Sequence, residues 1–261
     1  MIISLKNKKA LVGGASQGLG KAVAIQLAAS GASVTVMARN EEKLQKLVNE
    51  LPASSGQQHQ YLVVDFSELD HYKIIIEKYF TKNTIDILVN NTNGPKAGTV
   101  ADKTDEDYQS AFNLLFQTVQ HTTSLALKSM KENGFGRIIN LTSRTVKEPV
   151  DNLALSNTIR AAVVAWAKTL SRNVGKYNIT VNSILTGNFD TERLTELFEL
   201  QATAQNKSLP EIIKTAEADI PLQRLGRPEE LANVVCFLAS EQASYVTGTS
   251  IPIDGGLLRS W

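Results

Sequence analysis

The chain has 261 residues, enough for one large domain with a sizeable core, and its 43% hydrophobic and 20% charged content is ordinary for a globular protein. Its 27 basic and 26 acidic residues give a formal net charge of +1, so we expect no nucleic-acid partner. No apolar run approaches the length of a membrane span and the first residues do not form a signal peptide, which predicts a cytoplasmic protein with no membrane partner. The single cysteine, Cys236, excludes an internal disulfide and is expected to be a buried, inert thiol. The three histidines lack partners at metal-ligand spacing, so we expect no metal site and place them on the surface: His59, His71 and His121.

Short β-branched runs alternate along the chain with longer helical patterns. Strands are expected at Ala10–Val12, Ser33–Met37, Tyr61–Val64, Ile85–Asn90, Arg137–Leu141, Thr180–Leu185 and Ser250–Ile253. Helices are expected at Lys21–Ala29, Glu41–Glu50, Glu68–Thr81, Asp105–Glu132, Asn152–Tyr177 and Glu229–Ala239. Such alternation implies right-handed crossovers. It predicts a single domain over residues 1–261, of the α/β class, doubly wound (Rossmann-type), with a seven-stranded parallel sheet and helices on both faces.

The first strand breaks into a glycine-rich turn that leads directly into the first helix. Its sequence is Gly13-Gly14-Ala15-Ser16-Gln17-Gly18-Leu19-Gly20. Such a turn directs unpaired backbone N–H groups and the positive end of the helix dipole at one point, which attracts a phosphate. The spacing, glycine-x-x-x-glycine-x-glycine, is not the usual dinucleotide fingerprint, and a glycine turn alone is weak evidence. The rest of the chain must therefore support a nucleotide site.

One segment, residues 188–222, interrupts the alternation of strands and helices. It is polar but carries apolar residues at helical spacing, such as Leu194, Phe198 and Ile212, which predicts one or two inserted amphipathic helices. The insertion follows the sixth strand, so it lies over the carboxyl ends of the strands, where doubly wound folds bind ligands. We interpret it as a substrate lid, and the alternative is a solvated surface excursion.

Further segments carry recognisable patterns. They are Val89–Pro95 after the fourth strand, Gly136–Ser143 at the fifth, Thr186–Thr191 after the sixth, and Ile220–Glu230 with Tyr245–Gly256 near the end. Together with the glycine turn they resemble the short-chain dehydrogenase/reductase family over nearly the whole chain, and within it the bacterial 3-oxoacyl-acyl-carrier-protein reductases. Three positions depart from the family pattern in these segments: Thr92, Asn93, and Thr186 in place of a proline.

The resemblance implies an oxidoreductase that uses a nicotinamide cofactor and acts on a small molecule or an acyl thioester. It implies that Ser143 is a catalytic serine and that Asn113 anchors a water relay. The residues that it assigns to cofactor binding are Gly14, Ser16, Gln17, Gly18, Leu19, Gly20, Asp65, Phe66, Asn91, Gly187 and Thr191.

The end of the second strand indicates which nucleotide is preferred. Sites that prefer NAD(H) usually place a carboxylate about 20 residues after the glycines, where it accepts bonds from the ribose 2′-hydroxyl. This chain has Ala38, Arg39 and Asn40 there. A guanidinium suits a 2′-phosphate, so Arg39 favours NADP(H) over NAD(H), and the alternative is a solvated arginine at the start of the next helix.

The helix after Ser143 departs from the family at its two catalytic positions. The family has a tyrosine thirteen residues after the serine and a lysine four further on; the tyrosine exchanges a proton with the substrate oxygen. Here these positions are Ser156 and Arg160. Because residues at i and i+4 share a helix face, both side chains can point at the cofactor, and Arg160 can bridge ribose hydroxyls or stabilise a developing alkoxide. Loss of a positioned general acid typically costs about 10²–10⁴-fold in rate.

Three functions remain open from the sequence. The first is an active reductase of a ketone, such as a 3-oxoacyl thioester, with an altered proton path through a water, Ser143, Lys147 or Asp151. The second is a non-catalytic NADP-binding protein that acts as a regulatory or partner subunit, and the third is a structural relative with a vestigial site. Two helices are apolar beyond one stripe, which favours a homotetramer over a monomer with a deeper core, as the resemblance also implies.

Overall fold

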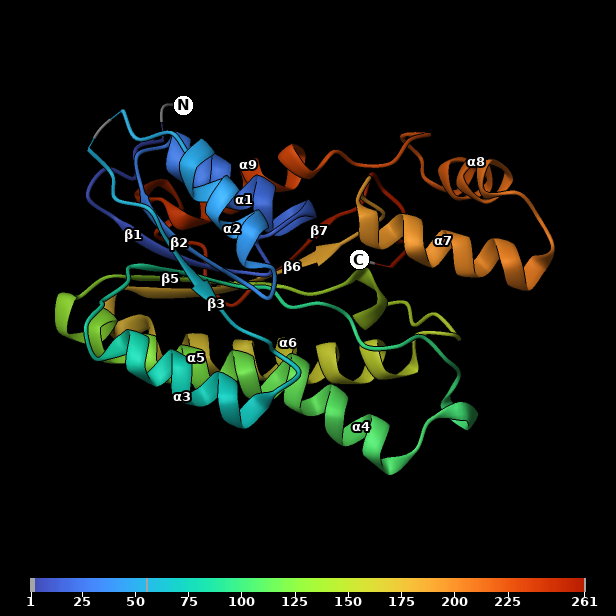
Figure 1. The fold of residues 1–261 in the computed structure, drawn as a ribbon, viewed down its shortest axis with the longest axis horizontal. Helices are drawn as coiled ribbons and strands as arrows, with labels where there is room; N and C mark the ends of the chain where they lie inside the picture. The colour runs from blue at the N-terminus through green and yellow to red at the C-terminus, as the bar shows by residue number, and fades with distance from the viewer. Residues whose placement is uncertain (1–2, 55, 261) are drawn as a thin grey trace.

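The computed structural model describes residues 3–54 and 56–260, and over these ranges the chain forms a seven-stranded, entirely parallel sheet (Figure 1). The strand order is β3-β2-β1-β4-β5-β6-β7. The strands are β1 Lys9–Gly13, β2 Ser33–Ala38, β3 Gln60–Val63, β4 Ile87–Asn90, β5 Gly136–Leu141, β6 Ile179–Thr186 and β7 Ser250–Ile253. The predicted α/β fold with seven parallel strands is confirmed.

Helices cover both faces of this sheet. One layer consists of α1 Gly18–Ala29, α2 Glu41–Glu50 and α9 Pro228–Ala239, and the other of α3 Leu69–Phe80, α4 Asp105–Phe112, α5 Thr118–Asn133 and α6 Ala154–Val174 (Figure 1). Short 3₁₀ turns lie at Val100–Asp102, Arg144–Val146, Gly175–Tyr177 and Glu241–Ala243. Across the described part of the chain, none of the helices is both long and apolar enough to span a membrane.

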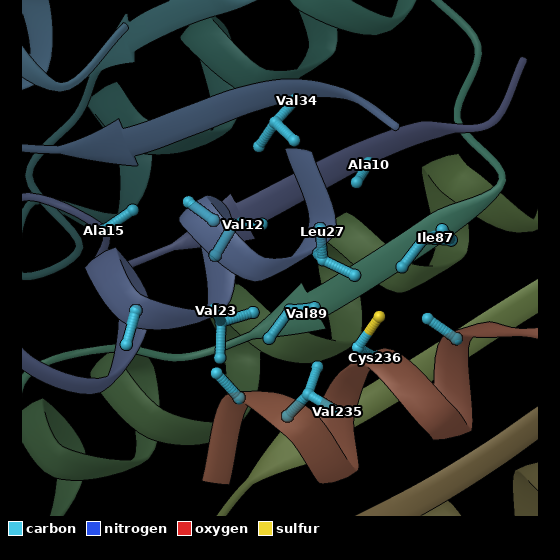
Figure 2. Close-up of a cluster of buried hydrophobic side chains, with 14 of the residues drawn as sticks. Ala10, Val12, Ala15, Val23, Leu27, Val34, Ile87, Val89, Val235 and Cys236 are labelled. Carbon is cyan, nitrogen blue, oxygen red and sulfur yellow. The ribbon is translucent and has the colours of Figure 1, made fainter. Parts of the chain in front are cut away.

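The central strands are apolar because both of their faces are buried. Figure 2 shows the cluster between the sheet and the α1/α9 layer, where Val12 and Val89 of the strands meet Val23 of α1 and Val235 of α9. Cys236 lies in the same cluster, and burial raises the pKa of its thiol, as expected for an inert cysteine. A second cluster fills the space between the opposite face and α3–α6. Packing on both faces holds the carboxyl ends of the strands rigidly.

The chain reverses its direction of strand addition at β1, which pairs with β2 on one side and with β4 on the other. A crevice opens at such a switch point, outside the carboxyl ends of the strands, and it is where doubly wound folds bind ligands. The glycine turn follows β1 and Asn91 follows β4. The fold therefore brings these two predicted site segments together.

The insertion after β6 forms two helices, α7 Glu192–Gln205 and α8 Leu209–Asp219, as predicted. They pack on each other through a small apolar cluster that includes Phe198 and Ile212, and they project beyond the sheet (Figure 1). A short bridge closes the base of the insertion, where the Asp190 amide donates to Gly226 O at 2.9 Å. This bridge ties the base of the two-helix unit to the body of the domain, and the first turn of α7 adds a hydrogen bond to Pro95 O and an ion pair with Lys43.

Several sequence predictions need correction in detail. The helix expected at Asp105–Glu132 is interrupted by a π-helical turn at Asn113–Gln117, which widens the backbone between α4 and α5. The strand β3 is an edge strand with largely exposed side chains, whereas its composition suggested burial. Helix α3 begins at Leu69 instead of Glu68, because Ser67 bonds to the Asp65 carboxylate instead of capping the helix.

Two of the histidines are not simple surface residues. His59 accepts the Val34 amide at 3.1 Å through Nδ1, and its Nε2 lies 3.0 Å from Pro52 O. His121 lies 3.1 Å from the Glu77 carboxylate. Both side chains are partly buried and serve local packing. The prediction of surface histidines was therefore wrong for these two.

Candidate active site

The glycine turn is held against the loop after β4 at distances that exclude side chains. A Cβ added at Gly13 would lie 2.4 Å from Asn91 O, and one at Gly20 would lie 2.3 Å from Gly14 O. Gly14 and Gly18 have positive φ angles of 57° and 54°, which L side chains rarely adopt. The glycines are therefore required by the turn itself, and the backbone remains open to a ligand.

The amino terminus of α1 has no side-chain cap among the described residues. Gln17, the N-cap residue, makes no capping bond, and its Oε1 instead accepts from Lys43 Nζ at 2.7 Å. In contrast, Asn40 caps α2 and Thr191 caps α7. A helix start needs partners for its first N–H groups. The free N–H groups at the start of α1, next to the glycine turn, therefore form a site suited to a phosphate.

Asn91 ties the glycine turn to the end of β4. Its Nδ2 donates to Gly13 O at 3.1 Å and to Gly14 O at 3.4 Å. On the other side of the turn, Gly18 lies against the side chain of Thr191, since an added Cβ would be 3.4 Å from Thr191 Cγ2. Gly187 packs closely against the chain after β7, where a Cβ would lie 2.5 Å from Asp254 Cα. These predicted cofactor-binding residues therefore gather around one crevice.

The predicted nucleotide-selecting residue, Arg39, is exposed at the end of β2. Its Nη1 lies 3.8 Å from Asp65 Oδ2, and its side chain is 62% exposed, so it is free to turn toward a phosphate. The pKa of Asp65 is lowered overall. Burial alone would raise this pKa, but two hydrogen bonds from Ser67 and the charge of Arg39 lower it by more, which keeps the carboxylate ionised. Phe66 differs from expectation, because its side chain is buried against Tyr72 and leaves only backbone groups for a ligand.

Ser143 follows β5 and caps the short turn Arg144–Val146, where its Oγ accepts the Thr145 amide at 3.2 Å. The residue before it, Thr142, is fixed from the neighbouring strand, because Thr186 Oγ1 donates to Thr142 O at 2.9 Å. Thr186 thus supplies a hydrogen bond at the position where the family pattern has proline. This bond links the loop that carries Ser143 to the loop that leads to the inserted helices.

Ser156 and Arg160 form a hydrogen-bonded pair on α6, as their i, i+4 spacing predicts. Arg160 Nε donates to Ser156 Oγ at 3.2 Å, and Arg160 Nη1 donates to Leu141 O at 2.9 Å, at the end of β5. Helix α6 packs against the turn after Ser143. The arginine therefore joins the two segments that carry the catalytic positions.

The guanidinium of Arg160 is partly buried and has no carboxylate partner among the described residues. Burial, and to a smaller extent the nearby charge of Arg193, lower the pKa of Arg160 to about 10. It is still protonated at neutral pH. The site therefore holds a positive charge whose counter-charge the protein does not supply.

Asn113 occupies the first position of the π-helical turn, and π turns are frequent at functional sites. Its Oδ1 accepts from Gln109 Nε2 at 2.9 Å. No hydrogen bond among the described residues joins it to Ser143, Ser156 or Arg160, so the structure does not test its predicted role in a water relay. Helix α6 packs against the π turn, which places Asn113 on an element next to the site.

Sequence reasoning missed two cations at the rim. Arg193, in the first turn of α7, donates to Pro95 O at 3.3 Å and so spans from the inserted helices to the loop after β4. Lys43 of α2 bonds Gln17 in the glycine turn and lies 3.7 Å from the Glu192 carboxylate. Neither residue belongs to a sequence motif, because each contact joins segments that are far apart in the sequence.

The crevice fits a dinucleotide phosphate. The turn excludes side chains, the first N–H groups of α1 are uncapped, and Arg39 and Lys43 flank the turn with positive charge. These are the features by which a helix start and its preceding turn bind pyrophosphate. The residues present are therefore compatible with a nicotinamide dinucleotide cofactor.

Comparison with known proteins identifies the family of the chain. Residues 14–258 match the family model described as Enoyl-(Acyl carrier protein) reductase. The chain is similar to the NADPH-dependent reductase BacG of Bacillus subtilis, with 32% identity over 98% of this chain and 100% of the relative. It is 34% identical to the 3-oxoacyl-[acyl-carrier-protein] reductase FabG of Thermotoga maritima, over 97% and 99% of the two chains.

A solved structure is similar over the full length. L-Sorbose reductase from Gluconobacter frateurii, complexed with NADPH and L-sorbose, superimposes with a TM-score of 0.92 at 28% identity, covering 100% of both chains. The match includes the inserted helices as well as the sheet, since no part of either chain lies outside the aligned length. The resemblance inferred from the sequence motifs is therefore confirmed at the level of the family and the fold.

Proposed function

Because this chain belongs to the short-chain dehydrogenase/reductase family, we propose that it is an NADP(H)-dependent oxidoreductase that reduces a ketone, such as a 3-oxoacyl thioester. The observation that carries the proposal is the junction of β1 and β4, where the glycine turn, the uncapped start of α1 and Asn91 lie together. NADPH, when bound, supplies the hydride for the carbonyl carbon, and the carbonyl oxygen takes a proton to give the alcohol and NADP⁺.

Two exposed cations support NADP(H) over NAD(H). Arg39 and Lys43 lie on the α2 side of the glycine turn. A 2′-phosphate accepts charge-assisted hydrogen bonds from such groups. Asp65 is paired with Arg39, so a bound phosphate would draw the guanidinium away from this carboxylate. BacG is named as an NADPH-dependent reductase, and the sorbose reductase structure contains NADPH.

Ser156 is the proton donor that this site offers in place of a tyrosine. Its Oγ accepts from Arg160 Nε, so its own hydrogen is available to the substrate oxygen. A positive charge 3.2 Å away favours the alkoxide that remains after donation. Ser143 lies on the adjacent turn and supplies a second hydroxyl. The proton that Ser156 gives up is then replaced through Ser143 or a water. Arg160 stabilises the negative charge that develops on the oxygen during this transfer.

A second candidate function is a non-catalytic NADP-binding subunit that regulates or partners another protein. The specific observation in its favour is Ser156, because a serine hydroxyl is a much weaker acid than a phenol and reaches less far. The crevice at the glycine turn is fully formed, which argues against a vestigial site. Cofactor binding and turnover therefore separate the three functions.

The test has two steps. NADPH is first titrated by fluorescence, with an Arg39→Ala variant to measure the part of the affinity that depends on the 2′-phosphate. NADPH oxidation is then followed with acetoacetyl-CoA, a 3-oxoacyl thioester. Binding with turnover supports the oxidoreductase; binding without turnover, also with free ketones, supports the subunit; no binding supports a vestigial site.

We also propose that the two inserted helices close over the substrate and that the protein is a homotetramer in the cytoplasm. The lid proposal follows from the short bridge at the base of the insertion, between Asp190 and Gly226. The tetramer proposal follows from partly buried aromatic side chains on neighbouring helices, with Phe116 stacked on Phe112 at 4.9 Å and edge-on to Trp166 at 5.9 Å. Light scattering of the purified protein tests the assembly, limited proteolysis with and without NADPH tests the lid, and cell fractionation tests the location.

A further inference from the structure

The strongest unexplained feature of the site is its excess of hydrogen-bond donors. Arg160 points two of its nitrogens at Ser156 Oγ and Leu141 O, and no carboxylate among the described residues balances its charge. Burying a charge without a partner is costly, so proteins normally pair it. A guanidinium that lacks a partner in the free protein is poised for a ligand that carries the opposite charge.

A second arginine approaches from the opposite wall of the site. Arg193 of α7 reaches the loop after β4, where it donates to Pro95 O and lies beside Gly94. Arg160 lines a small cavity together with Thr92 of this same loop, so both arginines reach the loop after β4, and the charge of Arg193 contributes to lowering the pKa of Arg160. Two guanidinium groups that repel each other in the free protein would both be stabilised by one anion between them. Glu196 pairs with Arg193 at 3.1 Å, and among the described residues it forms no ion pair with Arg160.

A small cavity lined by Arg160 contains a further unpaired hydrogen-bond donor. Its volume is about 10 Å³, enough for a single oxygen-sized atom, and its polar lining consists of Asn90, Thr92, Asn140, Thr142 and Arg160. Asn140 is 1% exposed, and its Nδ2 has no acceptor in the described part of the chain. Its Oδ1 is already occupied by Asn90 Nδ2 at 2.8 Å. The cavity therefore offers one more donor to an oxygen atom.

We propose that the region between Arg160 and Arg193 binds a carboxylate of the substrate, so that the preferred substrate is a small ketone bearing an anionic group. This inference rests on the proposed oxidoreductase function, since it names the class of ketone. The cofactor phosphates are the other source of an anion. They are bound from the opposite face of the sheet, by the glycine turn and α1, whereas Arg160 extends from α6.

The test uses two probes that match in shape and differ in charge. Malonate, a dicarboxylate that cannot be reduced by NADPH, and malonamide, its neutral counterpart, are titrated into the NADP⁺-loaded protein at constant ionic strength. We expect malonate to bind at least about tenfold more tightly than malonamide, because hydrogen bonds to charged groups are worth about that much. Arg160→Met should weaken malonate binding about 10- to 100-fold, and Arg193→Met by a smaller factor.

The matched control is Arg172→Met, which removes the same charge from an exposed position on the same helix. It should leave malonate binding unchanged. In parallel, NADPH oxidation is followed with acetoacetate and with its neutral methyl ester. We expect the wild type to prefer acetoacetate, the charged ketone, and Arg160→Met to lose this preference. Far-ultraviolet circular dichroism verifies that each variant is folded.

The possible outcomes separate this inference from the proposed function. If the wild type does not bind NADPH, the proposed function fails and this inference fails with it. If NADPH binds but malonate and malonamide bind equally, the carboxylate site is overturned and the proposed function stands. If Arg160→Met loses NADPH affinity by more than about tenfold while malonate binding shows no charge preference, the anion is a cofactor phosphate and the inference is again overturned.

Discussion

A buried and a partly buried arginine in this protein, Arg137 and Arg160, should respond differently to the same substitution. Arg137 of β5 is fully buried, and its guanidinium donates to three carbonyls, those of Gly136, Asn178 and Ser240. Its Nη2 lies 3.6 Å from Glu241. Arg160 makes two hydrogen bonds and has no acidic partner among the described residues. We expect Arg137→Met to destabilise the free protein strongly and Arg160→Met to leave its stability equal or higher.

The magnitudes follow from the two environments. Burial lowers the pKa of Arg160 from its ordinary value to about 10, which corresponds to a cost of about 3 kcal/mol for holding the charge in the folded protein. Losing its two hydrogen bonds costs about 2–3 kcal/mol, so the net change in unfolding free energy should lie within about 1 kcal/mol of zero. Arg137→Met removes three hydrogen bonds of a fully buried guanidinium, although Asn178 O keeps the Gly136 amide as a donor, and at about 1–3 kcal/mol for each of the other two carbonyls it should cost roughly 3 kcal/mol or more.

Urea unfolding at pH 7.5 measures the free energy of unfolding of both variants and of the wild type. The dependence of this free energy on urea concentration is compared between the proteins, because a changed slope would indicate a changed unfolded state. The folded-state pKa of Arg160 is depressed, so its penalty is present throughout the neutral range and disappears only as the pH rises past about 10. The relative stability of Arg160→Met should therefore be constant from pH 6 to 9. A loss for Arg160→Met as large as that for Arg137→Met would refute the conclusion that the Arg160 charge is uncompensated.

Three further predictions test other parts of the site and its support. Gly20→Ala should weaken NADPH binding at least about tenfold and lower stability by about 1–3 kcal/mol, because a Cβ there lies 2.3 Å from a backbone carbonyl; fluorescence titration and urea unfolding measure both effects. The double variant Ser156→Tyr/Arg160→Lys should gain about 10²-fold or more in acetoacetyl-CoA reduction, and no gain in a folded variant would contradict the assignment of these positions. Glu230→Gln should lower the melting temperature at neutral pH, since Arg224 holds the pKa of Glu230 near 2 through a hydrogen bond. The difference in melting temperature from the wild type should shrink as the pH falls from about 4 toward 2, because Glu230 becomes protonated in the folded protein. A difference that stays constant with pH would count against this ion pair.

The sheet was predictable because its physical signals are local. Strands buried on both faces have continuous apolar runs, and these identified β1, β2, β4, β5 and β6 within about two residues at each end. The glycine turn was equally visible, since close backbone contacts and positive φ angles leave no other residue possible. The positions of Ser156 and Arg160 followed from counting along one helix, and their hydrogen bond confirms the spacing.

Other features depend on long-range packing and were not predictable. The π turn at Asn113 has no signature in the residues around it, because it is a shift in hydrogen-bond register within one helical pattern. The exposure of β3 depends on its position at the edge of the sheet, which composition does not reveal. The burial of the Phe66 side chain in the core also depends on long-range packing, so its predicted cofactor contact, which stays a prediction, would involve the backbone.

The electrostatics of the site were also beyond the sequence. Replacement of a lysine by an arginine at position 160 conserves the formal charge, so sequence comparison alone treats it as a modest change. In the structure this guanidinium is held at a strand end by Leu141 O, and the charge of Arg193 from an inserted helix contributes to lowering the pKa of Arg160. Whether a charge is balanced depends on all charged groups within several ångströms of it. Here the two arginines, Arg160 and Arg193, are 33 positions apart in the chain, so the sequence does not reveal that they interact.

These charges also bear on how the inserted helices would close. Arg193 lies in the first turn of α7, and its charge contributes to lowering the pKa of Arg160, so in the closure proposed above repulsion between the two would act on the movement of α7. A bound anion removes that repulsion and adds a contact on each side. Substrate binding and closure are then coupled through one pair of arginines, and a neutral ketone of the same size would fill the site without supplying the free energy that closes it.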